Sequence, residues 1–570
     1  MALDRKTSAR VLREISRLLE VQNDNIHRVR AFANASRVVE RLDGDLEAMV
    51  ESSELLGIKG IGKGTFAVLE ELAAGRTPKV LEDLKNDTPA GVRAMLEIPG
   101  LGPKKVRVLW QDLGAISLGE LEYACRENRL VELPGFGAKT QERLLESIRF
   151  ARHANERRLM NEAWTAATAL EIALEEHPEV DRVVIAGEVR RFCETVDAVE
   201  LVVVSEDEDA AGAILGAHLS DVERSGPGRW IGVTENGFAV RVHVVGPPAT
   251  AAALVKATGS DDHLDALSGR ASPLGLELRD DGLWQDDNRL ECPDEDAVYR
   301  ALGCRWVPPE LREDGTEVER AAAGTLPELV TIEDVLGVLH NHTTDSDGVA
   351  TVGEMAASAR ARGWSFFGVA DHSPVAVYAN GVTVDRLFDQ WRRIDELNSD
   401  GGGLRVVKGL EADVLSDGTL DIPPGCEDGL EYVVASVHSG FRLSQERQTE
   451  RIVSAVSHPA CSVLGHPTGR LLLARPGYAV DLERVLQACL EHGVALEINA
   501  SPYRLDLGWR WARRALELGL KLAVNPDAHS IEGLDDVRWG LAVARKAGAT
   551  AADLVNCGDI DEFLKNLGTR

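Results

Sequence analysis

The sequence lacks long apolar runs. No stretch approaches the roughly 18 consecutive apolar residues that a membrane-spanning helix needs. The first residues, MALDRKTSAR, also lack the apolar core of a secretion signal. These absences argue against a membrane protein and against a secreted one. We therefore expect a cytoplasmic protein with no membrane partner.

The sequence also lacks closely spaced cysteines, and its basic residues are outnumbered by acidic ones. The eight Cys residues are scattered, and no two have the spacing of a thiolate zinc site, so neither such a site nor a disulfide framework is indicated. Lys and Arg total 63 against 93 Asp and Glu, which gives a formal net charge of -30. Such a surface repels DNA at long range, and nucleic-acid binding therefore needs local evidence.

The chain does have the composition and length of several globular domains. Hydrophobic residues make up 44% and charged residues 27% of the 570 residues, which is ordinary for a soluble protein and corresponds to about three to five domains. Changes of pattern predict short helices over 1–80 and 81–150, a helix followed by three β-rich runs over 151–245, mixed elements over 246–315, a polar linker at 316–334 and a final domain at 335–570.

The final domain alternates strands and helices. Seven short apolar runs are separated in most cases by helix-like segments, the pattern of a barrel of parallel strands with active-site loops at the strand carboxyl ends. The runs occupy 335–339, 366–370, 404–409, 432–436, 462–465, 494–498 and 522–525.

Side chains that bind metals follow these runs. They are His340, His342, Asp347, His372, Glu411, His438, His466, Asp527 and His529. His340 and His342 lie two apart on an extended segment, so they point the same way and can chelate one ion. Glu411 can bridge two cations, and mixed His and carboxylate ligands suit Zn²⁺, Mn²⁺ or Fe. Nine such residues in register with strand ends predict a site of several divalent ions that holds a phosphate and activates water.

The runs HNHTTDSDG, ADHS, GLEADVL, ASVHSGF, GHPTGRLL, LEINASPYRLDL and NPDAHS closely resemble the polymerase-and-histidinol-phosphatase (PHP) domain. The whole chain resembles the bacterial family X DNA polymerases. The resemblance implies a multidomain α+β and α/β fold with a manganese-dependent 3′–5′ exonuclease and phosphoesterase in its PHP part. The implied domains are an 8-kDa-like helix-hairpin-helix domain (1–80), a fingers-like helix-hairpin-helix domain (81–150), a palm-like nucleotidyltransferase domain (151–245), a thumb-like domain (246–315) and a C-terminal (β/α)7 PHP barrel (335–570).

The resemblance also implies a trinuclear metal centre, with Mn²⁺ as the expected metal and Zn²⁺ or Fe as alternatives. We assign one ion to His340, His342, Glu411 and Asp527, which are also the predicted catalytic residues. A second ion is assigned to Glu411, His438 and His466. The third is assigned to Asp347, His372 and His529. Arg470 and Arg504 are candidate contacts to the substrate phosphate. For each of these arginines, a role as a salt-bridge partner is the alternative.

Three Gly-apolar-Gly segments lie in the front end: LLGIKGIGKG, LEIPGLGPKK and VELPGFGAKT. We interpret them as helix-hairpin-helix motifs, because glycines let backbone N–H groups at a helix start approach a phosphate closely. Ordinary helix connections are the alternative. Such contacts position DNA without reading its sequence, so gapped or 3′-recessed DNA, bound by its backbone, is the predicted partner. The predicted contacts are Gly60, Gly62, Lys63, Gly100, Gly102, Lys104, Lys105, Gly135, Gly137 and Lys139.

The palm-like segment GEVRRFCETVDAVELVVV departs from the family pattern. It keeps two arginines, but Glu188 replaces the serine that contacts a triphosphate in the family. Ala198 and Glu200 replace the first two catalytic aspartates, and Arg241, in the later run AVRVHVV, replaces the third. Three carboxylates hold two Mg²⁺ in such a palm, so Mg²⁺ is not expected here. We predict that Glu200 and Arg241 form an ion pair in its place. Asp197, one residue off the strand face of Glu200, should point away.

These features together predict a monomeric DNA-repair-type nuclease. Its polymerase-like half binds DNA, its polymerase site is inactive, and its PHP barrel hydrolyses phosphodiesters at a 3′ end. Two alternatives stay open: a gap-filling DNA polymerase with an attached 3′–5′ exonuclease, and a small-molecule phosphatase whose front end only binds a partner. The hairpin motifs argue against the phosphatase, which has no need of them.

Overall fold

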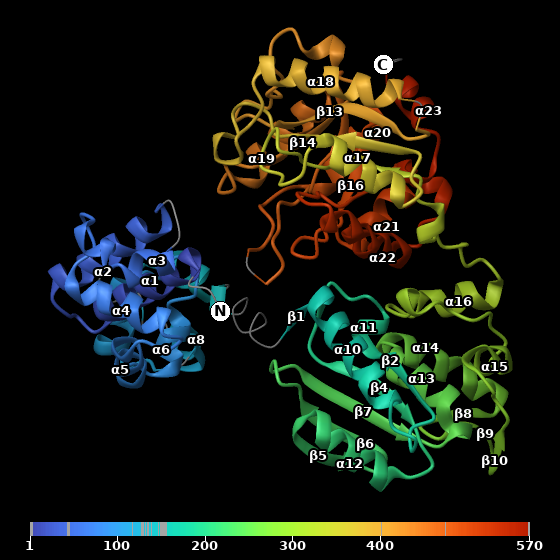
Figure 1. Cartoon of the computed structure of the whole chain (residues 1–570). Helices are drawn as coiled ribbons and strands as arrows, with labels where there is room; N and C mark the ends of the chain where they lie inside the picture. Colours follow the sequence, from blue (N-terminus) through green and yellow to red (C-terminus); the bar gives the residue numbers. More distant parts are fainter. Residues whose placement is uncertain are drawn as a thin grey trace. The chain divides into compact units, whose positions relative to one another are not determined.

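The computed structural model describes residues 4–42, 46–116, 118–126, 130, 133, 136–137, 139–145, 147–148, 157–400, 402–473 and 475–567. The chain forms two compact units, Met1–Glu156 and Arg157–Arg570, which Figure 1 draws in sequence colours. Within the described ranges, no helix is long and apolar enough to cross a membrane.

The first unit consists of short helices around an apolar core. The helices are α1 (Arg5–Val21), α2 (Ile26–Glu40), α3 (Leu46–Glu51), α4 (Lys63–Ala73), α5 (Lys79–Asp87), α6 (Ala90–Met95), α7 (Pro103–Arg107) and α8 (Leu118–Arg126). In α1, Leu12, Ile15 and Leu19 recur at helical spacing and are fully buried. The α1 helix contacts α2, α5 and α7, and its apolar face therefore organises the unit.

The second unit begins with a mixed sheet of five strands, ordered β2-β4-β7-β6-β5. The strands are β2 (Arg182–Ala186), β4 (Val199–Val204), β5 (Ser220–Gly226), β6 (Arg229–Val233) and β7 (Ala239–Val245), with helices α10 (Met160–Glu175), α11 (Gly187–Arg190) and α12 (Glu208–His218) and a short pair β1 (Arg158–Leu159) and β3 (Thr195–Val196). β4 and β7 run parallel. The apolar runs of the sequence predict β2, β4 and β7, but β5 is exposed and polar and gives no such signal.

A thumb-like layer follows the sheet. It contains α13 (Thr250–Thr258), α14 (Asp261–Ala271), β8 (Leu276–Arg279), β9 (Gly282–Gln285), β10 (Asn288–Leu290) and α15 (Glu295–Ala301). The segment predicted as a linker is not a free connection, because it holds α16 (Thr316–Ala323), where Glu317 and Val318 are buried. The polar residues of this segment suggested an exposed linker. Glu317 is nevertheless buried, because it has a partner: its Oε1 lies 2.6 Å from His263 Nδ1.

The rest of the chain forms a nearly closed barrel of seven parallel strands that neighbour one another in chain order. They are β11 (Gly337–Val338), β12 (Phe366–Val369), β13 (Arg405–Asp413), β14 (Tyr432–Ser436), β15 (Cys461–Leu464), β16 (Ala495–Asn499) and β17 (Leu522–Asn525). The alternating pattern of the sequence is thereby confirmed. A parallel bridge between Asn341 and Ala528 brings the ends of the first and last strands together. The backbone N–H of Leu339 also donates to Asn525 Oδ1 at 2.9 Å across this seam.

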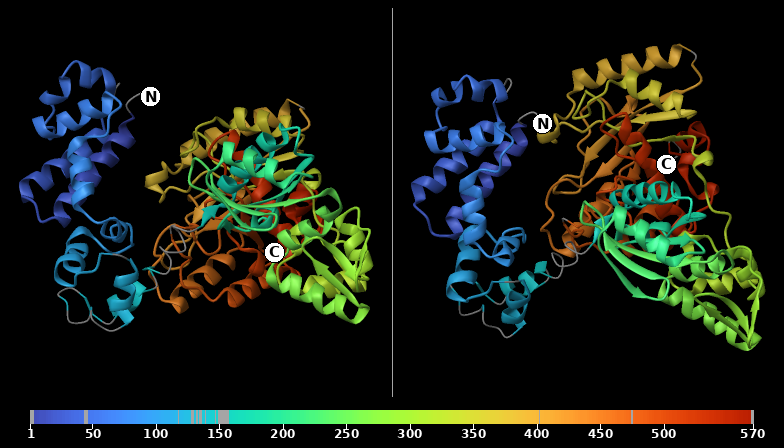
Figure 2. Two further views of the ribbon diagram at one scale, coloured as in Figure 1. Left: turned by 90° about the horizontal axis from the view of Figure 1, so that it is seen from below. Right: turned by 60° about the horizontal axis from the view of Figure 1, so that its bottom comes forward.

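Helices lie around these strands (Figure 2): α17 (Val352–Ala361), α18 (Val384–Ser399), α19 (Gln445–Val456), α20 (Leu482–His492), α21 (Trp509–Glu517), α22 (Val537–Ala547) and α23 (Ile560–Leu567). One buried apolar cluster takes a residue from nearly every strand, as the filled interior of a small barrel does. Its strand members are Phe366, Val407, Tyr432, Val434, Val463, Ala495 and Ala523.

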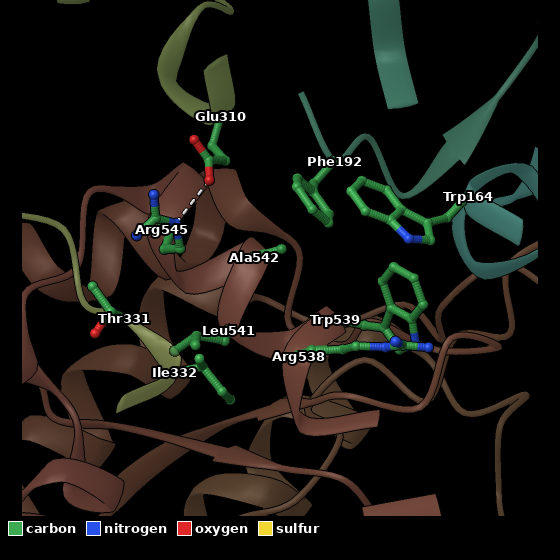
Figure 3. Close-up of a pocket in the computed structure, with 10 residues that line it drawn as sticks. All are labelled: Trp164, Phe192, Glu310, Thr331, Ile332, Arg538, Trp539, Leu541, Ala542 and Arg545. Atoms are coloured by element: carbon green, nitrogen blue, oxygen red, sulfur yellow. Dashed lines mark hydrogen bonds and ion pairs between the residues drawn. The ribbon is translucent and has the colours of Figure 1, made fainter. Parts of the chain in front are cut away.

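Helix α22 joins the barrel to the palm-like sheet. Its Trp539 lies with its ring centroid 6.2 Å from that of Trp164 and 6.4 Å from that of Phe192. The three rings line a cavity of about 250 Å³ (Figure 3). Lys546, only 1% exposed, pairs with Glu313 and donates to the backbone oxygen of Arg191 at 2.9 Å. The junction is therefore a packed core with a buried ion pair.

Candidate metal centre and nucleic-acid interface

The carboxyl ends of the barrel strands bring the nine predicted side chains together. His340 and His342 follow β11, Glu411 lies near the end of β13, and Asp527 follows β17. Because parallel strands end on one rim, His342 Nε2 and Asp527 Oδ1 lie 3.0 Å apart although they are distant in sequence.

Glu411 is the centre of the cluster. Its Oε1 lies 3.2 Å from His340 Nε2, 3.2 Å from His438 Nε2 and 3.1 Å from His466 Nε2. Its Oε2 lies 2.8 Å from His372 Nδ1. A carboxylate with imidazoles on both oxygens is well placed to bridge cations.

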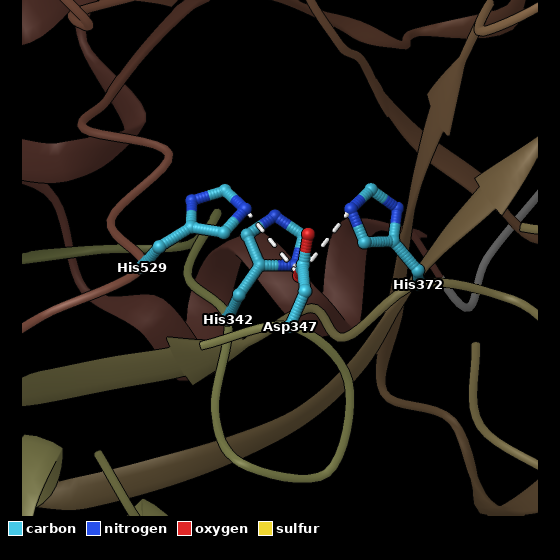
Figure 4. A group of neighbouring side chains, drawn as sticks. All are labelled: His342, Asp347, His372 and His529. Carbon is cyan, nitrogen blue, oxygen red and sulfur yellow. Dashed lines mark ion pairs between the residues drawn. The ribbon is translucent and has the colours of Figure 1, made fainter. Parts of the chain in front are cut away.

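Asp347 holds the outer part of the cluster. Its Oδ1 lies 3.8 Å from His342 Nδ1, 3.4 Å from His529 Nε2 and 3.6 Å from His372 Nε2. Figure 4 shows the three rings around this carboxylate. His342 therefore faces Asp347 with one ring nitrogen and Asp527 with the other.

Three groups of side chains have ligand atoms within 4.8 Å of one another and could each hold an ion. They are His342, Asp347, His372 and His529; His340, His342 and Asp527; and His372, Glu411 and His438. These groups overlap the three predicted ligand sets, but they place His342 beside Asp347 as well and use His372 twice.

Charges of opposite sign are crowded in this buried space. Burial alone would raise the pKa of Glu411, but the surrounding imidazoles, His438 first, outweigh it and hold that pKa well below its usual range. Burial lowers the pKa of His342 to about 3, so this ring is neutral. Burial also opposes charge on His438, yet Glu411 and Asp413 raise its pKa to about 10. The central carboxylate is therefore ionised at neutral pH, as a metal ligand must be.

Several buried ligand atoms have close charged neighbours but make no well-directed hydrogen bond to any residue that the structure describes. They are His340 Nε2, His342 Nδ1 and Glu411 Oε2. Leaving a buried polar atom unpaired costs about 1–3 kcal/mol, so such atoms are rare without a reason. Divalent ions would satisfy these lone pairs, and imidazole nitrogens with carboxylate oxygens are the donors that Mn²⁺, Zn²⁺ or Fe accept. The residues therefore fit a divalent-metal centre.

Two buried acids behind the ligands were missed by the sequence prediction. Glu497 Oε1 lies 2.8 Å from His340 Nδ1, and its Oε2 accepts from the backbone N–H of His466 at 2.6 Å. Asp413 Oδ1 lies 3.2 Å from His438 Nδ1. Such carboxylates orient a ring so that its other nitrogen faces the ion. One signal was available: Glu497 interrupts the apolar run VALEI, and a buried acid is costly unless it is paired.

The cluster is open on one side. The His529 side chain is 41% exposed and that of Asp347 34%, whereas those of His340 and His342 are fully buried. A substrate must therefore reach the centre past Asp347 and His529.

The two predicted arginines differ in their surroundings. Arg504 Nε lies 3.9 Å from Asp527 Oδ2, so this guanidinium reaches the cluster. Arg470 instead pairs with Glu194 at 3.0 Å and donates from Nε to the backbone oxygen of Arg504 at 2.9 Å. Arg470 thus makes the salt bridge that the sequence left open, and it supports the loop that carries Arg504.

An ion-pair cluster forms at the palm positions that the sequence comparison sets against the family's catalytic aspartates. β4 and β7 pair Glu200 with Arg241 in register, and Arg241 Nη1 lies 3.0 Å from Glu200 Oε1, as predicted. The prediction that Asp197 points away is wrong, because Arg241 Nη2 lies 2.8 Å from Asp197 Oδ2. Asp197 precedes β4, so the alternation of side chains along a strand does not apply to it.

Two other palm positions are also filled from within the chain. Glu188 accepts from Arg157 Nη2 at 2.8 Å and from the backbone N–H of Asp197 at 3.0 Å. Ala198 is buried and has no ligand atom. Glu188 is therefore already engaged by partners within the chain.

The two arginines that the palm keeps are engaged by the thumb. Arg190 makes two hydrogen bonds to the Glu295 carboxylate, at 2.9 and 2.6 Å. Arg191 Nε lies 2.9 Å from Glu313 Oε1. A triphosphate would have to displace these carboxylates to use either guanidinium.

The first two predicted hairpins have the expected backbone. Gly60 has φ +110° and Gly100 φ +88°, in the left-handed region that favours glycine. Gly62 and Gly102 are the N-cap residues of α4 and α7. The lysines Lys63, Lys104 and Lys105 lie in these helices; Gly137 and Lys139 of the third segment are described, while Gly135 lies outside the described residues.

Family models match four parts of the chain. They are a helix-hairpin-helix domain at 4–78, a SAM-like helix-hairpin-helix tandem at 92–149, the DNA polymerase beta thumb at 253–313 and the PHP domain at 339–501. The hairpin and thumb domains imply DNA binding.

Individual proteins match as well. The DNA polymerase/3′-5′ exonuclease PolX of Bacillus subtilis (strain 168) is 32% identical over 572 residues, which covers 99% of this chain and 100% of that protein. A probable phosphatase of Thermoanaerobacter sp. (strain X514) is 31% identical over 239 residues, 40% of this chain and 93% of its own length. The crystal structure of Leishmania infantum polymerase beta in a ternary complex matches 38% of this chain and 97% of its own, at 19% identity and a TM-score of 0.26.

The full-length identity identifies the class of protein. The chain belongs to the bacterial family X DNA polymerases that carry a PHP domain.

Proposed function

We propose that this chain acts mainly as a Mn²⁺-dependent 3′–5′ exonuclease on DNA, with hydrolysis at the PHP centre and no polymerisation at the palm. The observation that carries the proposal is the convergence of six imidazoles and three carboxylates on one barrel rim, with Glu411 in the middle. The hairpin and thumb domains supply a DNA-binding context that a small-molecule phosphatase does not need.

The proposed centre would hold three ions in the predicted ligand sets. The first would be held by His340, His342, Glu411 and Asp527, the second by Glu411, His438 and His466, and the third by Asp347, His372 and His529. When bound, divalent ions neutralise phosphodiester charge and lower the pKa of a coordinated water. Within the chain, Glu497 orients His340, Asp413 orients His438, and Arg504 offers a positive charge to the phosphate.

The palm supports the second half of the proposal. Nucleotidyl transfer in this family requires carboxylates that hold two Mg²⁺. Here the Arg241 guanidinium lies between Asp197 and Glu200, and Ala198 offers no ligand atom. Arg190, which is paired with Glu295, is not free for a triphosphate.

The relatives point to two other functions. The Bacillus subtilis protein is named a DNA polymerase as well as an exonuclease, and the protein matched by the PHP region alone is named a probable phosphatase. A gap-filling polymerase with an attached exonuclease and a small-molecule phosphatase are therefore the alternatives to be separated.

One paired assay separates them. Labelled gapped and 3′-recessed DNA is incubated with Mn²⁺ or Mg²⁺, with and without deoxynucleotides. We expect shortening with Mn²⁺ and no extension under any condition. Extension would establish the polymerase, and inertness toward DNA with turnover of small phosphate esters would establish the phosphatase.

Two variants test the metal assignment. His340→Ala and Glu411→Ala each remove a ligand and leave buried partners unpaired, so both should abolish shortening. His458→Ala, a histidine on the exposed surface of the same domain, is the matched control and should retain full activity. Shortening by both ligand variants would refute the assignment.

A further inference from the structure

Exposed apolar side chains gather on the loops that carry the metal ligands. Val349 is 75% exposed, Val377 83% and Tyr503 60%. They follow the carboxyl ends of β11, β12 and β16 respectively. A single exposed valine is ordinary on a protein surface, but an apolar group beside a functional site marks a contact surface.

Contacts of their loops connect these residues to the open side of the cluster. The backbone N–H of Val349 donates to the backbone oxygen of His529 at 2.8 Å, and His529 is the most exposed ligand. Asn380 Nδ2 donates to the backbone oxygen of Ser346 at 3.0 Å, which ties the loop of Val377 to the loop of Val349. Tyr503 directly precedes Arg504, whose guanidinium lies 3.9 Å from Asp527.

The loop that presents Val377 is held firmly. The backbone N–H of Val382 donates to the backbone oxygen of His372 at 2.8 Å, and that of Val375 donates to Asp421 Oδ2 at 2.7 Å. Ala376 and Ala379 are buried on either side of Val377. The loop thus buries Ala376, Ala379 and Val382 and leaves Val375 and Val377 exposed to solvent.

We infer that Val349, Val377 and Tyr503 form an apolar rim that packs against the base of the terminal nucleotide while the metal centre takes the adjacent phosphodiester. The inference rests on the proposed exonuclease function. A nucleotide presents an anionic phosphate beside a flat apolar base, and aromatic and aliphatic side chains bind any base without reading it.

Two features favour a base as the occupant. Residues 335–570 contain more acidic than basic side chains, so long-range attraction for a phosphate chain is not available there. A protein partner on this rim would cover the entrance past Asp347 and His529 that any substrate must use. A base enters together with the phosphate and leaves with the product.

The test compares two oligonucleotides that differ only at the 3′ residue, which is a normal nucleotide in one and an abasic tetrahydrofuran unit in the other. The wild-type chain should have a lower KM for the normal end. Tyr503→Ser should raise that KM by about five- to a hundredfold, and Val349→Thr and Val377→Thr by about threefold each. The KM for the abasic end should not change, nor should kcat for either oligonucleotide.

Leu490→Thr is the matched control, because Leu490 is an exposed apolar residue on α20, away from the strand carboxyl ends. Unchanged Mn²⁺ affinity in each rim variant confirms that the ligands stay in place. Equal KM values for both ends in the wild type, or equal losses on both ends in the variants, would overturn the rim. Failure of the wild type to shorten either oligonucleotide would instead refute the exonuclease function on which the rim rests.

Discussion

Glu497 is fully buried behind the metal ligands and accepts hydrogen bonds from several directions. Besides His340 and the backbone of His466, it accepts from Asn525 Nδ2 at 3.0 Å. Asn525 in turn accepts from the backbone N–H of Leu339 across the barrel seam. This acid therefore couples the orientation of two ligands to the closure of the barrel.

Glu497→Gln replaces one acceptor oxygen with an NH₂ group of the same size, so either the His340 ring or the His466 backbone loses its acceptor. We expect about 10- to 100-fold weaker Mn²⁺ binding, measured by calorimetry on metal-stripped protein. Glu483→Gln, which alters an exposed ion pair with Arg514 on the barrel surface, is the control. Unchanged Mn²⁺ affinity would show that Glu497 does not position the ligands.

At the scale of elements, α14 and α16 enclose a polar group that responds to pH. His263 is fully buried, with Nδ1 2.6 Å from Glu317 Oε1 and Nε2 2.8 Å from the Tyr299 hydroxyl. Burial raises the pKa of Glu317 to about 7 and, together with Arg312, lowers that of His263 to about 3. Ionisation of Glu317 therefore disfavours the folded state.

This penalty is absent below the unfolded pKa of Glu317 and complete above its folded pKa of about 7. Glu317→Gln removes it and keeps an acceptor for His263. At pH 8 the free energy of unfolding of the variant should exceed that of the wild type by on the order of 1–3 kcal/mol, seen as a higher unfolding temperature. At pH 5 the variant should lose most of that advantage.

His263, whose pKa burial lowers to about 3, is neutral at both pH values and does not contribute to this difference. Glu319→Gln, on the exposed side of the same helix, should show no such difference. An advantage of Glu317→Gln that is larger at pH 5 than at pH 8 would contradict the assigned direction.

The hairpin helices offer a second test at this scale. Lys63 and Lys104 are exposed near the starts of α4 and α7. If each lysine contacts one phosphate, the double variant Lys63→Ala with Lys104→Ala should show a less steep fall of log affinity with log salt concentration. The slope should become shallower by about 0.9 per contact. Fluorescence anisotropy with gapped DNA measures the slope. Lys85→Ala, which breaks an ion pair with Glu14, is the control, and identical slopes would reject the hairpin contacts.

Over the whole molecule, charge is divided unevenly. Basic and acidic residues balance within 1–156, so the net charge of -30 comes from 157–570. We therefore expect DNA binding to depend on local contacts, such as those of the hairpin helices in the first unit, and not on general attraction.

The palm–barrel junction is the second feature of the whole molecule. Glu313→Gln removes the carboxylate that the buried Lys546 ammonium shares with the Arg191 guanidinium. Loss of one partner of a buried pair should destabilise the second unit by about 3 kcal/mol, seen as a lower unfolding temperature. It should also expose sites to limited proteolysis between sheet and barrel.

The double variant Glu313→Gln with Lys546→Met should recover part of this loss, because the buried ammonium that had lost its carboxylate is then gone. A double variant that is less stable than Glu313→Gln alone would contradict a buried ion pair.

The sequence by itself determined the barrel and the metal-binding side chains at the carboxyl ends of its strands. Seven apolar runs mark the strands, and the ligands follow them, because strand length and the polarity of strand ends are local properties of the chain. The turns of the first two hairpins were likewise predictable from local sequence, because Gly60 and Gly100 have the left-handed backbone that favours glycine.

Only the tertiary structure decided the rest. It placed Asp197 against Arg241, paired Arg470 with Glu194, put Glu497 behind two ligands and packed α16 where a linker was predicted. Each of these contacts joins side chains that are far apart in sequence or lie outside regular elements. Their partners are set by packing, and no local period in the sequence encodes them.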